Sequence, residues 1–270
     1  MELYATLEHV LTIQQPSEKI NAFKLFYSHY SAGNVHRQTA AIPREFDKPS
    51  YHGFCSICDP KEVPKRTKLG TAHGQILLLH AIAHIEYSAI DLALDAAYRF
   101  RDMGDEFISD WLKVADDEVR HFEMIDALLQ ELGSYYGEHP VHDALFEASQ
   151  RTVNVLERMA VVPRYLEANG LDATPLILKK LEQYQQDPMV SKIMKALQII
   201  LDEEVDHVLR GDRWFHVACE QENVHPDIYF EIIERHYPKS FPRKVAINCD
   251  ARKCAGFECR ELEKISLVKC

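Results

Sequence analysis

The sequence has few of the features that mark secreted, nucleotide-binding or hydrolytic proteins. Its ten glycines form neither the GxGxxG nor the GxxxxGK[ST] motif that holds nucleotide phosphates, and no GxSxG motif is present. The seven cysteines are odd in number and scattered, which argues against a disulfide framework and suits a reducing compartment. The N-terminus lacks a signal peptide pattern, and the most apolar run, residues 76–85, is too short to span a bilayer. We therefore expect a cytoplasmic protein without membrane contact.

Positive charge is also scarce. The 270 residues include 42 acidic and 31 basic side chains, a formal net charge of −11, together with fourteen histidines. A negative total argues against non-specific binding to a phosphate backbone, so RNA is only a weak candidate partner. The excess of carboxylate and imidazole is either solvated surface or, in part, a set of ligands for a cation.

Helical periodicity dominates the chain after residue 72. We expect helices over about 73–102, 105–132, 143–168, 175–186, 188–210 and 226–236, with Asn169-Gly170 capping the third and Thr174-Pro175 starting the fourth. Residues 1–72 read as an irregular extension with two short helices, near 3–14 and 17–31, followed by a proline-rich stretch. Strand-type alternation is nearly absent. This pattern predicts an all-α protein: an N-terminal extension (1–72), a four-helix bundle (73–215), and a C-terminal helix with a tail (216–270).

Three glutamates lie within apolar helical stripes. Glu86, Glu118 and Glu204 each have apolar residues three, four and seven positions away. A carboxylate that points into such a face costs several kcal/mol, of order 2–7, unless it is paired or bound to a metal. We therefore treat these three residues as candidate ligands.

Two of these glutamates begin an ExxH pair. Glu118 precedes His121, and Glu204 precedes His207, by three residues. Such a spacing places carboxylate and imidazole on one helix face, about one turn apart. Four-helix bundles bind two metals with ExxH on two helices and a single Glu on each of the others. The pattern predicts a di-metal site to which Glu86 belongs.

The fourth carboxylate would come from the third helix, where Glu157 and Glu167 compete. Glu86 lies 18 residues before Gly104, and Glu118 lies 14 residues after it. Counted from Asp187, Glu204 lies 17 residues after, Glu167 20 before and Glu157 30 before. Glu167 therefore lies at a depth from the turn closer to that of Glu204, and we favour it as the ligand. The expected break at 169–175 makes this count approximate.

Four carboxylates and two neutral imidazoles would balance two divalent cations, so the site could be buried with little net charge. Oxygen donors with a minority of imidazole suit iron, or alternatively manganese, better than zinc. Asp117 and Glu203, which precede the ExxH glutamates, are candidates for orienting the histidine of the opposite helix by its second nitrogen. The alternative is that both are ordinary solvated acids.

Four strings carry a resemblance to a known family: His80-Ala-Ile-Ala-His84-Ile-Glu86, Ala115-Asp-Asp-Glu-Val-Arg-His121, Pro163-Arg-Tyr-Leu-Glu-Ala-Asn-Gly-Leu-Asp172, and Asp202-Glu-Glu-Val-Asp-His207 with Arg213-Trp-Phe215. They resemble a family of bacterial ferritin-like proteins catalogued as a domain of unknown function, over about Pro49 to Phe257. The resemblance implies a ferritin-like bundle with a di-metal carboxylate site and supports Glu167 as a ligand. The ligand pattern is also similar to that of the di-iron tRNA hydroxylase family, but the substrate does not carry over.

These observations favour a di-iron oxidoreductase that activates O₂ to oxidise a substrate, for which a small molecule is our first expectation. The alternatives are a ferritin-like metal-binding or ferroxidase protein without an organic substrate, and a structural bundle that has lost its metals. The sequence identifies neither the electron donor nor the oligomeric state.

Three further features have simpler interpretations. His73, His80, His84, Tyr87, Asp91 and Tyr98 share one helix face, which we expect to pack against the N-terminal extension through hydrogen bonds. Cys55 and Cys58 form a lone CxxC that is more often incidental than a zinc site, even with Cys249, Cys254, Cys259 and Cys270 elsewhere. Residues 238–270 carry a net charge of +4, which predicts a basic tail lying on an acidic body; contact with an anionic partner is the alternative.

Overall fold

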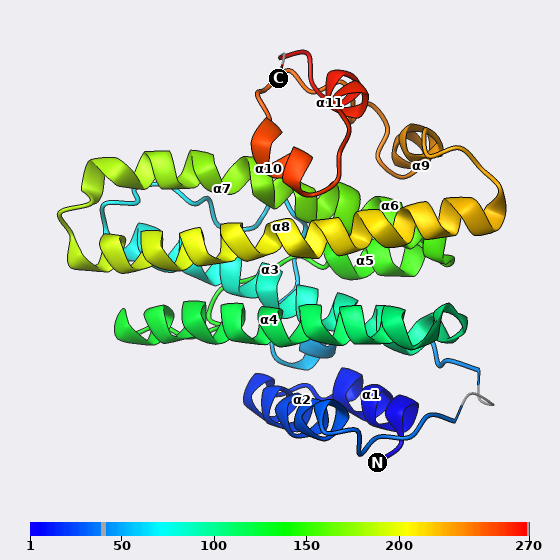
Figure 1. Cartoon of the computed structure of the whole chain (residues 1–270). Coiled ribbons are helices and arrows are strands. Elements are labelled where there is room, and N and C mark those ends of the chain that lie inside the picture. Colours follow the sequence, from blue (N-terminus) through cyan, green and yellow to red (C-terminus); the bar gives the residue numbers. More distant parts are fainter. Residues whose placement is uncertain (39–41, 269) are drawn as a thin grey trace. The chain divides into compact units, whose positions relative to one another are not determined.

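The computed structural model describes residues 1–38, 42–268 and 270. Within these residues the backbone forms helices and a few isolated bridges, such as that between Ile57 and Val141, and no β-strand. The predicted all-α class is therefore confirmed. The chain divides into two compact units, residues 1–146 and 147–270, and each is described here by itself (Figure 1).

Unit 1 is built around two long helices joined by a tight turn. Its helices are α1 (Leu3–Thr12), α2 (Pro16–Ser31), α3 (Ala72–Arg99) and α4 (Gly104–Glu131), with 3₁₀ turns at Ser50–Gly53 and Arg101–Met103. Gly104 has a φ of 86°, a conformation that favours glycine, and lets the chain reverse between α3 and α4. The predicted break at this glycine is confirmed.

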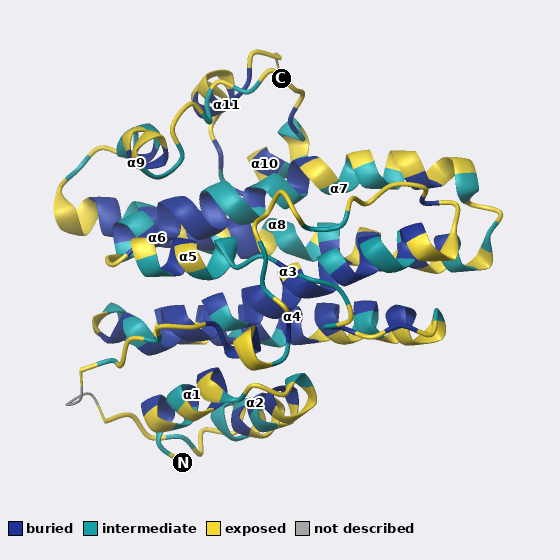
Figure 2. Cartoon of the chain, turned by 180° about the vertical axis from the view of Figure 1, so that it is seen from behind, coloured by how far each residue is buried: buried dark blue, intermediate teal, exposed yellow. Residues whose placement is uncertain are grey.

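Helix α3 forms the core of unit 1. It has the length and hydropathy of a membrane-crossing helix, but 72% of its most apolar window is buried within the protein. Figure 2 shows its surface as mostly buried. Its apolar character is thus accounted for by packing against α4 and the N-terminal extension.

The N-terminal extension is attached to α3 by buried polar contacts. Lys19 of α2 is fully buried and forms an ion pair with Asp91 of α3, and the Ser50 hydroxyl donates to the same carboxylate at 2.5 Å. Farther along α3, the Tyr98 hydroxyl donates to Glu8 at 2.6 Å. The expected packing of this helix face against the extension is confirmed at Asp91 and Tyr98.

Unit 2 contains a long helix and a second helical run with a π-helical turn. Helix α5 (Ala144–Arg151) crosses the boundary between the units. The others are α6 (Val155–Val161), the π-helical turn (Val162–Glu167), α7 (Ala168–Leu181), a 3₁₀ turn (Glu182–Tyr184), α8 (Pro188–Glu222), α9 (Ile228–His236), α10 (Cys249–Cys254) and α11 (Cys259–Ile265).

The third helix differs from the prediction at both ends. It is not continuous from 143, because the chain breaks before Asn154, whose side chain accepts the Glu157 amide at 2.8 Å and caps α6. The predicted end at Asn169-Gly170 is also wrong, since the π-helical turn passes directly into α7 and Pro175 lies inside that helix.

Contacts with the C-terminal tail explain why Pro175 is tolerated there. Proline has no backbone N–H, so the carbonyl of Leu171, four residues earlier, loses its helical partner. The side-chain amide of Asn248 donates to this carbonyl at 3.2 Å. A residue 73 positions beyond Pro175 thus supplies the missing hydrogen bond.

Helix α8 is longer than predicted, because it continues through Gly211 instead of ending at Arg210. A Cβ atom on Gly211 would lie 2.1 Å from Cβ of Pro163 in the π-helical turn. Glycine is therefore required here because the Pro163 ring packs directly against the backbone of α8.

Replacing Gly211 by alanine is expected to lower the free energy of unfolding by about 1–3 kcal/mol, because the added methyl group overlaps Pro163. The matched control is Gly170→Ala in α7, where an added Cβ meets no atom within 4 Å. That change is expected to raise the free energy of unfolding by about 0.4–1 kcal/mol. Urea denaturation of both variants measures the difference, and equal effects would contradict the close approach of α8 to Pro163.

Candidate metal centre

Three predicted ligands come together in unit 1. Glu86 lies on α3, and Glu118 and His121 lie one turn apart on α4. Nδ1 of His121 is 3.3 Å from a carboxylate oxygen of Glu86 and 3.5 Å from one of Glu118. Each residue offers a donor atom, and these atoms lie within 4.8 Å of one another. All three side chains are buried, and Glu118 and His121 have no exposed surface.

The electrostatics of this cluster favour a bound cation. Burial disfavours the imidazolium form of His121, but hydrogen bonding and charge from Glu118 and Glu86 outweigh it and raise the pKa of His121 to about 11. Without a metal, the imidazole therefore holds a proton at neutral pH. The donor set consists of two carboxylates and one imidazole, which fits a divalent transition metal in place of that proton.

Unit 2 contains the other three predicted ligands. Glu204 and His207 lie one turn apart on α8, with 3.5 Å between a carboxylate oxygen and Nδ1. His207 is buried, whereas Glu204 and Glu167 are half-buried. Glu167 is the last residue of the π-helical turn. The sequence did not indicate this turn, although Pro163 within a helical pattern was a signal of irregularity.

The competing residue Glu157 has other partners. Its carboxylate oxygens lie 2.6 Å from Nη1 of Arg235 and 3.3 Å from Nε2 of His236, both at the end of α9. These contacts pair Glu157 with Arg235 and His236 of unit 2 and give it a structural role. They favour Glu167 as the candidate ligand.

A buried arginine fixes the π-helical turn to α8. Arg164 lies 2.8 Å from Asp212 of α8 and 2.9 Å from Glu261 of α11. Its guanidinium carbon is 4.6–4.8 Å from the ring centroids of three aromatic residues, Phe215, Tyr229 and Phe257. Neither Arg164 nor Asp212 was a candidate functional residue from the sequence. Together with the contact between Pro163 and Gly211, they hold the segment that carries Glu167 against the helix that carries Glu204.

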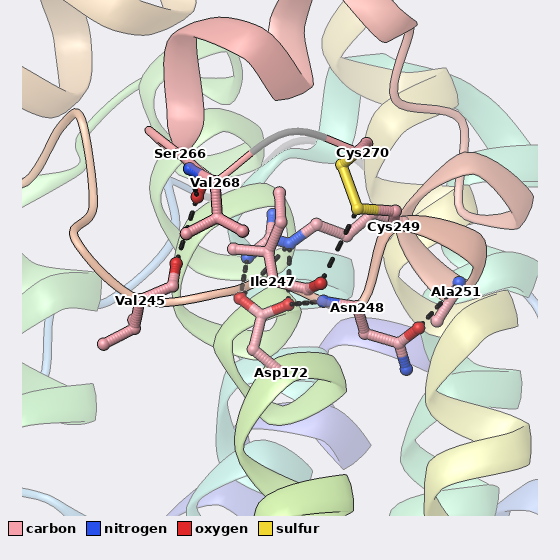
Figure 3. Close-up of a disulfide and its surroundings, with 10 residues drawn as sticks. Asp172, Val245, Ile247, Asn248, Cys249, Ala251, Ser266, Val268 and Cys270 are labelled. Carbon is pink, nitrogen blue, oxygen red and sulfur yellow. Dashed lines mark hydrogen bonds and ion pairs between the residues drawn. A yellow bond between two sulfur atoms is a disulfide. The ribbon is translucent and has the colours of Figure 1, made fainter.

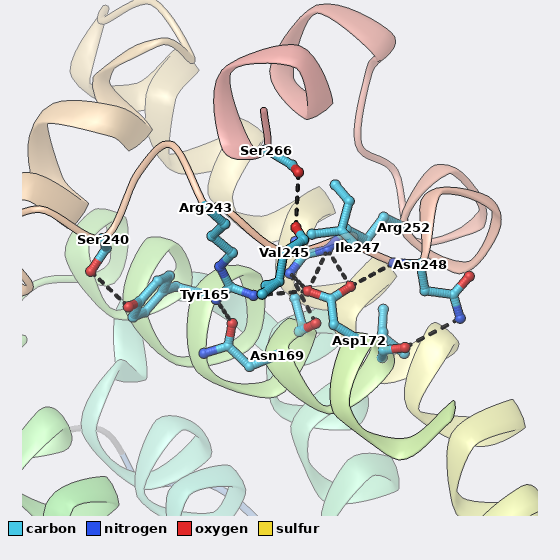
Figure 4. Close-up of polar contacts among 12 residues, drawn as sticks. Tyr165, Asn169, Asp172, Ser240, Arg243, Val245, Ile247, Asn248, Arg252 and Ser266 are labelled. Carbon is cyan, nitrogen blue, oxygen red and sulfur yellow. Dashed lines mark hydrogen bonds and ion pairs between the residues drawn. The ribbon is translucent and has the colours of Figure 1, made fainter. Parts of the chain in front are cut away.

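The start of α7 is held by a second charged network (Figure 4). Asp172 accepts hydrogen bonds from Arg243 at 2.9 Å, from Arg252 at 2.7 and 3.0 Å, and from the Asn248 amide at 2.8 Å. Arg252 also donates to the carbonyl of Ala168 at 3.1 Å. The expected contact of a basic tail with an acidic body is confirmed at Asp172.

The two residues proposed to orient the histidines have different surroundings. Asp117 is buried and lies 2.6 Å from Lys113 and 2.5 Å from Arg120 of its own helix. Glu203 is half-buried on α8. Asp117 is therefore not an ordinary solvated acid, and the orienting role of both residues stays a prediction.

The cysteines correct one expectation. Cys249 and Cys270 form a disulfide bond, whereas the sequence had argued against such bonds (Figure 3). The pairing was missed because α10 and the C-terminus are brought together by tertiary contacts of the tail. It removes both residues from a zinc site shared with Cys55 and Cys58, and burial raises the pKa of the Cys55 thiol to about 11.

The described residues define an all-α protein with a carboxylate–imidazole cluster in unit 1 and a second ExxH pair in unit 2. Residues 12–263 match the family described as protein of unknown function (DUF455), and the chain belongs to this family. It is 41% identical over 219 residues to an uncharacterized protein of Haemophilus influenzae, covering 78% of this chain and 74% of that protein. No solved structure matches the chain.

His80 and His84 of α3 form their hydrogen bonds with the loop after α4, which the sequence had not suggested. The ring of His84 also packs edge-on against Tyr51 of the N-terminal extension, with 4.8 Å between the ring centroids, as expected. Nε2 of His80 accepts hydrogen bonds from the amides of Gly137 and His139 at 2.9 and 3.3 Å, so the ring is neutral with its proton on Nδ1. His84 contacts the Tyr136 hydroxyl and the His142 carbonyl. Burial lowers the pKa of both histidines to about 4.

Acidification is therefore expected to destabilise the fold. Because the folded pKa of His80 lies below the unfolded value of 6.5, the unfolded state takes up the proton first. The contribution to stability is complete above pH 6.5 and falls by roughly 3 kcal/mol as the pH drops towards 4. Urea denaturation at several pH values checks this. In the His80→Gln variant, the free energy of unfolding should fall less steeply with decreasing pH. Identical slopes for the variant and the parent protein would count against it.

Proposed function

We propose that this protein is a di-metal carboxylate oxidoreductase of the ferritin-like type, in which two iron ions activate O₂ to oxidise a small organic substrate. Manganese is the alternative metal. The observation that carries the proposal is the buried cluster of Glu86, Glu118 and His121, whose charge calls for a cation.

The ligands in this proposal are the six residues predicted from the sequence. Glu86, Glu118 and His121 come from unit 1, and Glu167, Glu204 and His207 come from unit 2. The support is the ligand pattern: two ExxH helices and two single glutamates match the set found in di-metal bundles. Four carboxylates and two neutral imidazoles also balance the charge of two divalent ions.

The chain's own residues would hold the site rigid and dry. Such a metal pair, when bound, supplies electron transfer to O₂. The apolar neighbours of Glu118 and His121 on α4, including Val114, Ala115 and Phe122, exclude water from the unit 1 ligands. In unit 2, the ion pair between Arg164 and Asp212 restrains the turn that carries Glu167. Loss of a proton from His121 would accompany metal binding.

The N-terminal extension and the C-terminal tail favour an oxygenase over an iron-storage protein. Residues 1–72 and 238–270 pack on the long helices through buried pairs, such as Lys19 with Asp91 and Arg252 with Asp172. The subunits of an iron-storage shell are compact helical bundles, which do not need such additional segments. Iron uptake far above about two ions per chain, within a large symmetric assembly, would favour storage instead.

Metal analysis tests the proposed site. Protein loaded with Fe(II) without oxygen and then desalted is expected to retain about two metal ions per chain. Glu118→Ala and His207→Ala are expected to lose most of this metal, because each variant lacks one of the six proposed ligands. Unchanged metal content in both variants would overturn the proposed ligand set. O₂ consumption by the loaded parent protein then separates an oxidase from a passive metal carrier.

A matched pair of variants tests the choice of ligand on the third helix. Glu167→Ala is expected to lower the metal content as Glu118→Ala does. Glu157→Ala is expected to retain the metal, because Glu157 already pairs with Arg235 and His236. The reverse result would assign the ligand to Glu157. Circular dichroism of each variant confirms that the helices remain folded.

A further inference from the structure

The tail of unit 2 supplies two buried charged side chains to its core. Arg252 of α10 and Glu261 of α11 have 1% and 4% of their surface exposed, and they pair with Asp172 and Arg164. The disulfide bond between Cys249 and Cys270 closes a loop around the segment that contains both. Figure 3 shows this bond beside Asp172 and Asn248. The covalent bond and the ion pairs thus act on the same segment.

This segment completes the hydrogen bonding of the start of α7. Arg252 donates to the carbonyl of Ala168, and Asn248 donates to the carbonyl of Leu171, which Pro175 leaves without a helical donor. Ala168 directly follows Glu167. Residues 248–252 must therefore stay in place if the carbonyls of Ala168 and Leu171 are to keep their hydrogen-bond donors.

The disulfide bond is placed where small molecules can reach it. Cys270 is exposed and Cys249 is half-buried, whereas the core disulfides of small secreted domains are enclosed. The other five cysteines of the chain are free thiols. An accessible disulfide in a chain with many free thiols belongs to the labile, exchangeable class.

We propose that Cys249 and Cys270 are a reversible thiol–disulfide exchange site, whose closure locks the tail onto α7. The partner is a small thiol of the glutathione class. Its thiolate attacks one sulfur of the bond, the S–S bond breaks, and a mixed disulfide forms. A second small thiol displaces the protein sulfur and leaves as the small disulfide. Two electrons and two protons are thereby transferred, and Cys249 and Cys270 become thiols. The inference rests on contacts within unit 2 and does not require a bound metal.

Counting thiols tests the pairing. The full-length protein is equilibrated with reduced and oxidised glutathione at several ratios, and its free thiols are measured after denaturation. Seven thiols are expected under reducing conditions and five under oxidising ones, with Cys249 and Cys270 in one cross-linked peptide. Seven thiols at every ratio, or pairing with other cysteines, would overturn the proposal.

Hydrogen exchange tests the lock on the unaltered protein. Reduction is expected to speed amide exchange several-fold in residues 243–252 and 168–172, and to lower the melting temperature by about 5–10 °C because a loop constraint is lost. Cys249→Ser/Cys270→Ser should behave as reduced protein under both conditions. Cys254→Ser/Cys259→Ser, which removes two exposed free thiols, should keep the response. Equal exchange of residues 168–172 in the oxidised and reduced protein would refute the lock, whatever the metal content.

Discussion

Two carboxylates that lie side by side in a protein interior require a positive charge between them, because neither can be solvated by water. In unit 1 the imidazole of His121 stands between Glu86 and Glu118 and takes up a proton to meet this requirement. The surrounding structure serves the same arrangement. The turn at Gly104 brings α3 back along α4, so that a residue near the middle of each helix can share one cation. A metal ion in this place would meet the same electrostatic demand and would release the proton.

Unit 2 faces a different constraint, since one of its candidate ligands lies on an irregular helix. A π-helical turn carries an extra residue in one turn and so changes the direction of the side chains that follow. Such a segment needs partners outside its own helix. Arg164 and Asp172 provide them through buried ion pairs with α8 and the C-terminal tail. Buried pairs of this kind add little net stability but discriminate against other packings, because a misplaced partner leaves a charge unpaired.

The errors in the predicted helices around residues 169–175 have one physical cause. Asn169, Gly170 and Pro175 are local signals for the end of one helix and the start of another. Contacts from distant residues overrule them: Arg243 binds the side chain of Asn169, and Asn248 satisfies the carbonyl freed by Pro175. The helix predicted to end at residue 210 continues through Gly211, whose lack of a side chain makes room for Pro163. Local propensity cannot report a partner that lies far away in the sequence.

The sequence by itself determined the helical class, the turn at Gly104 and five of the candidate ligands, namely Glu86, Glu118, His121, Glu204 and His207. These follow from short-range periodicity, because residues three or four apart share a helix face and an isolated carboxylate in an apolar stripe is costly. Only the tertiary structure decided that His121 lies between Glu86 and Glu118, that Glu157 pairs with Arg235, and that Cys249 bonds to Cys270. Each of these depends on the packing of separate elements, which no local pattern records. The few basic residues include arginines that pair with acids inside the protein: Arg164 and Arg252 are buried against Asp212 and Asp172, and the half-buried Arg243 also pairs with Asp172.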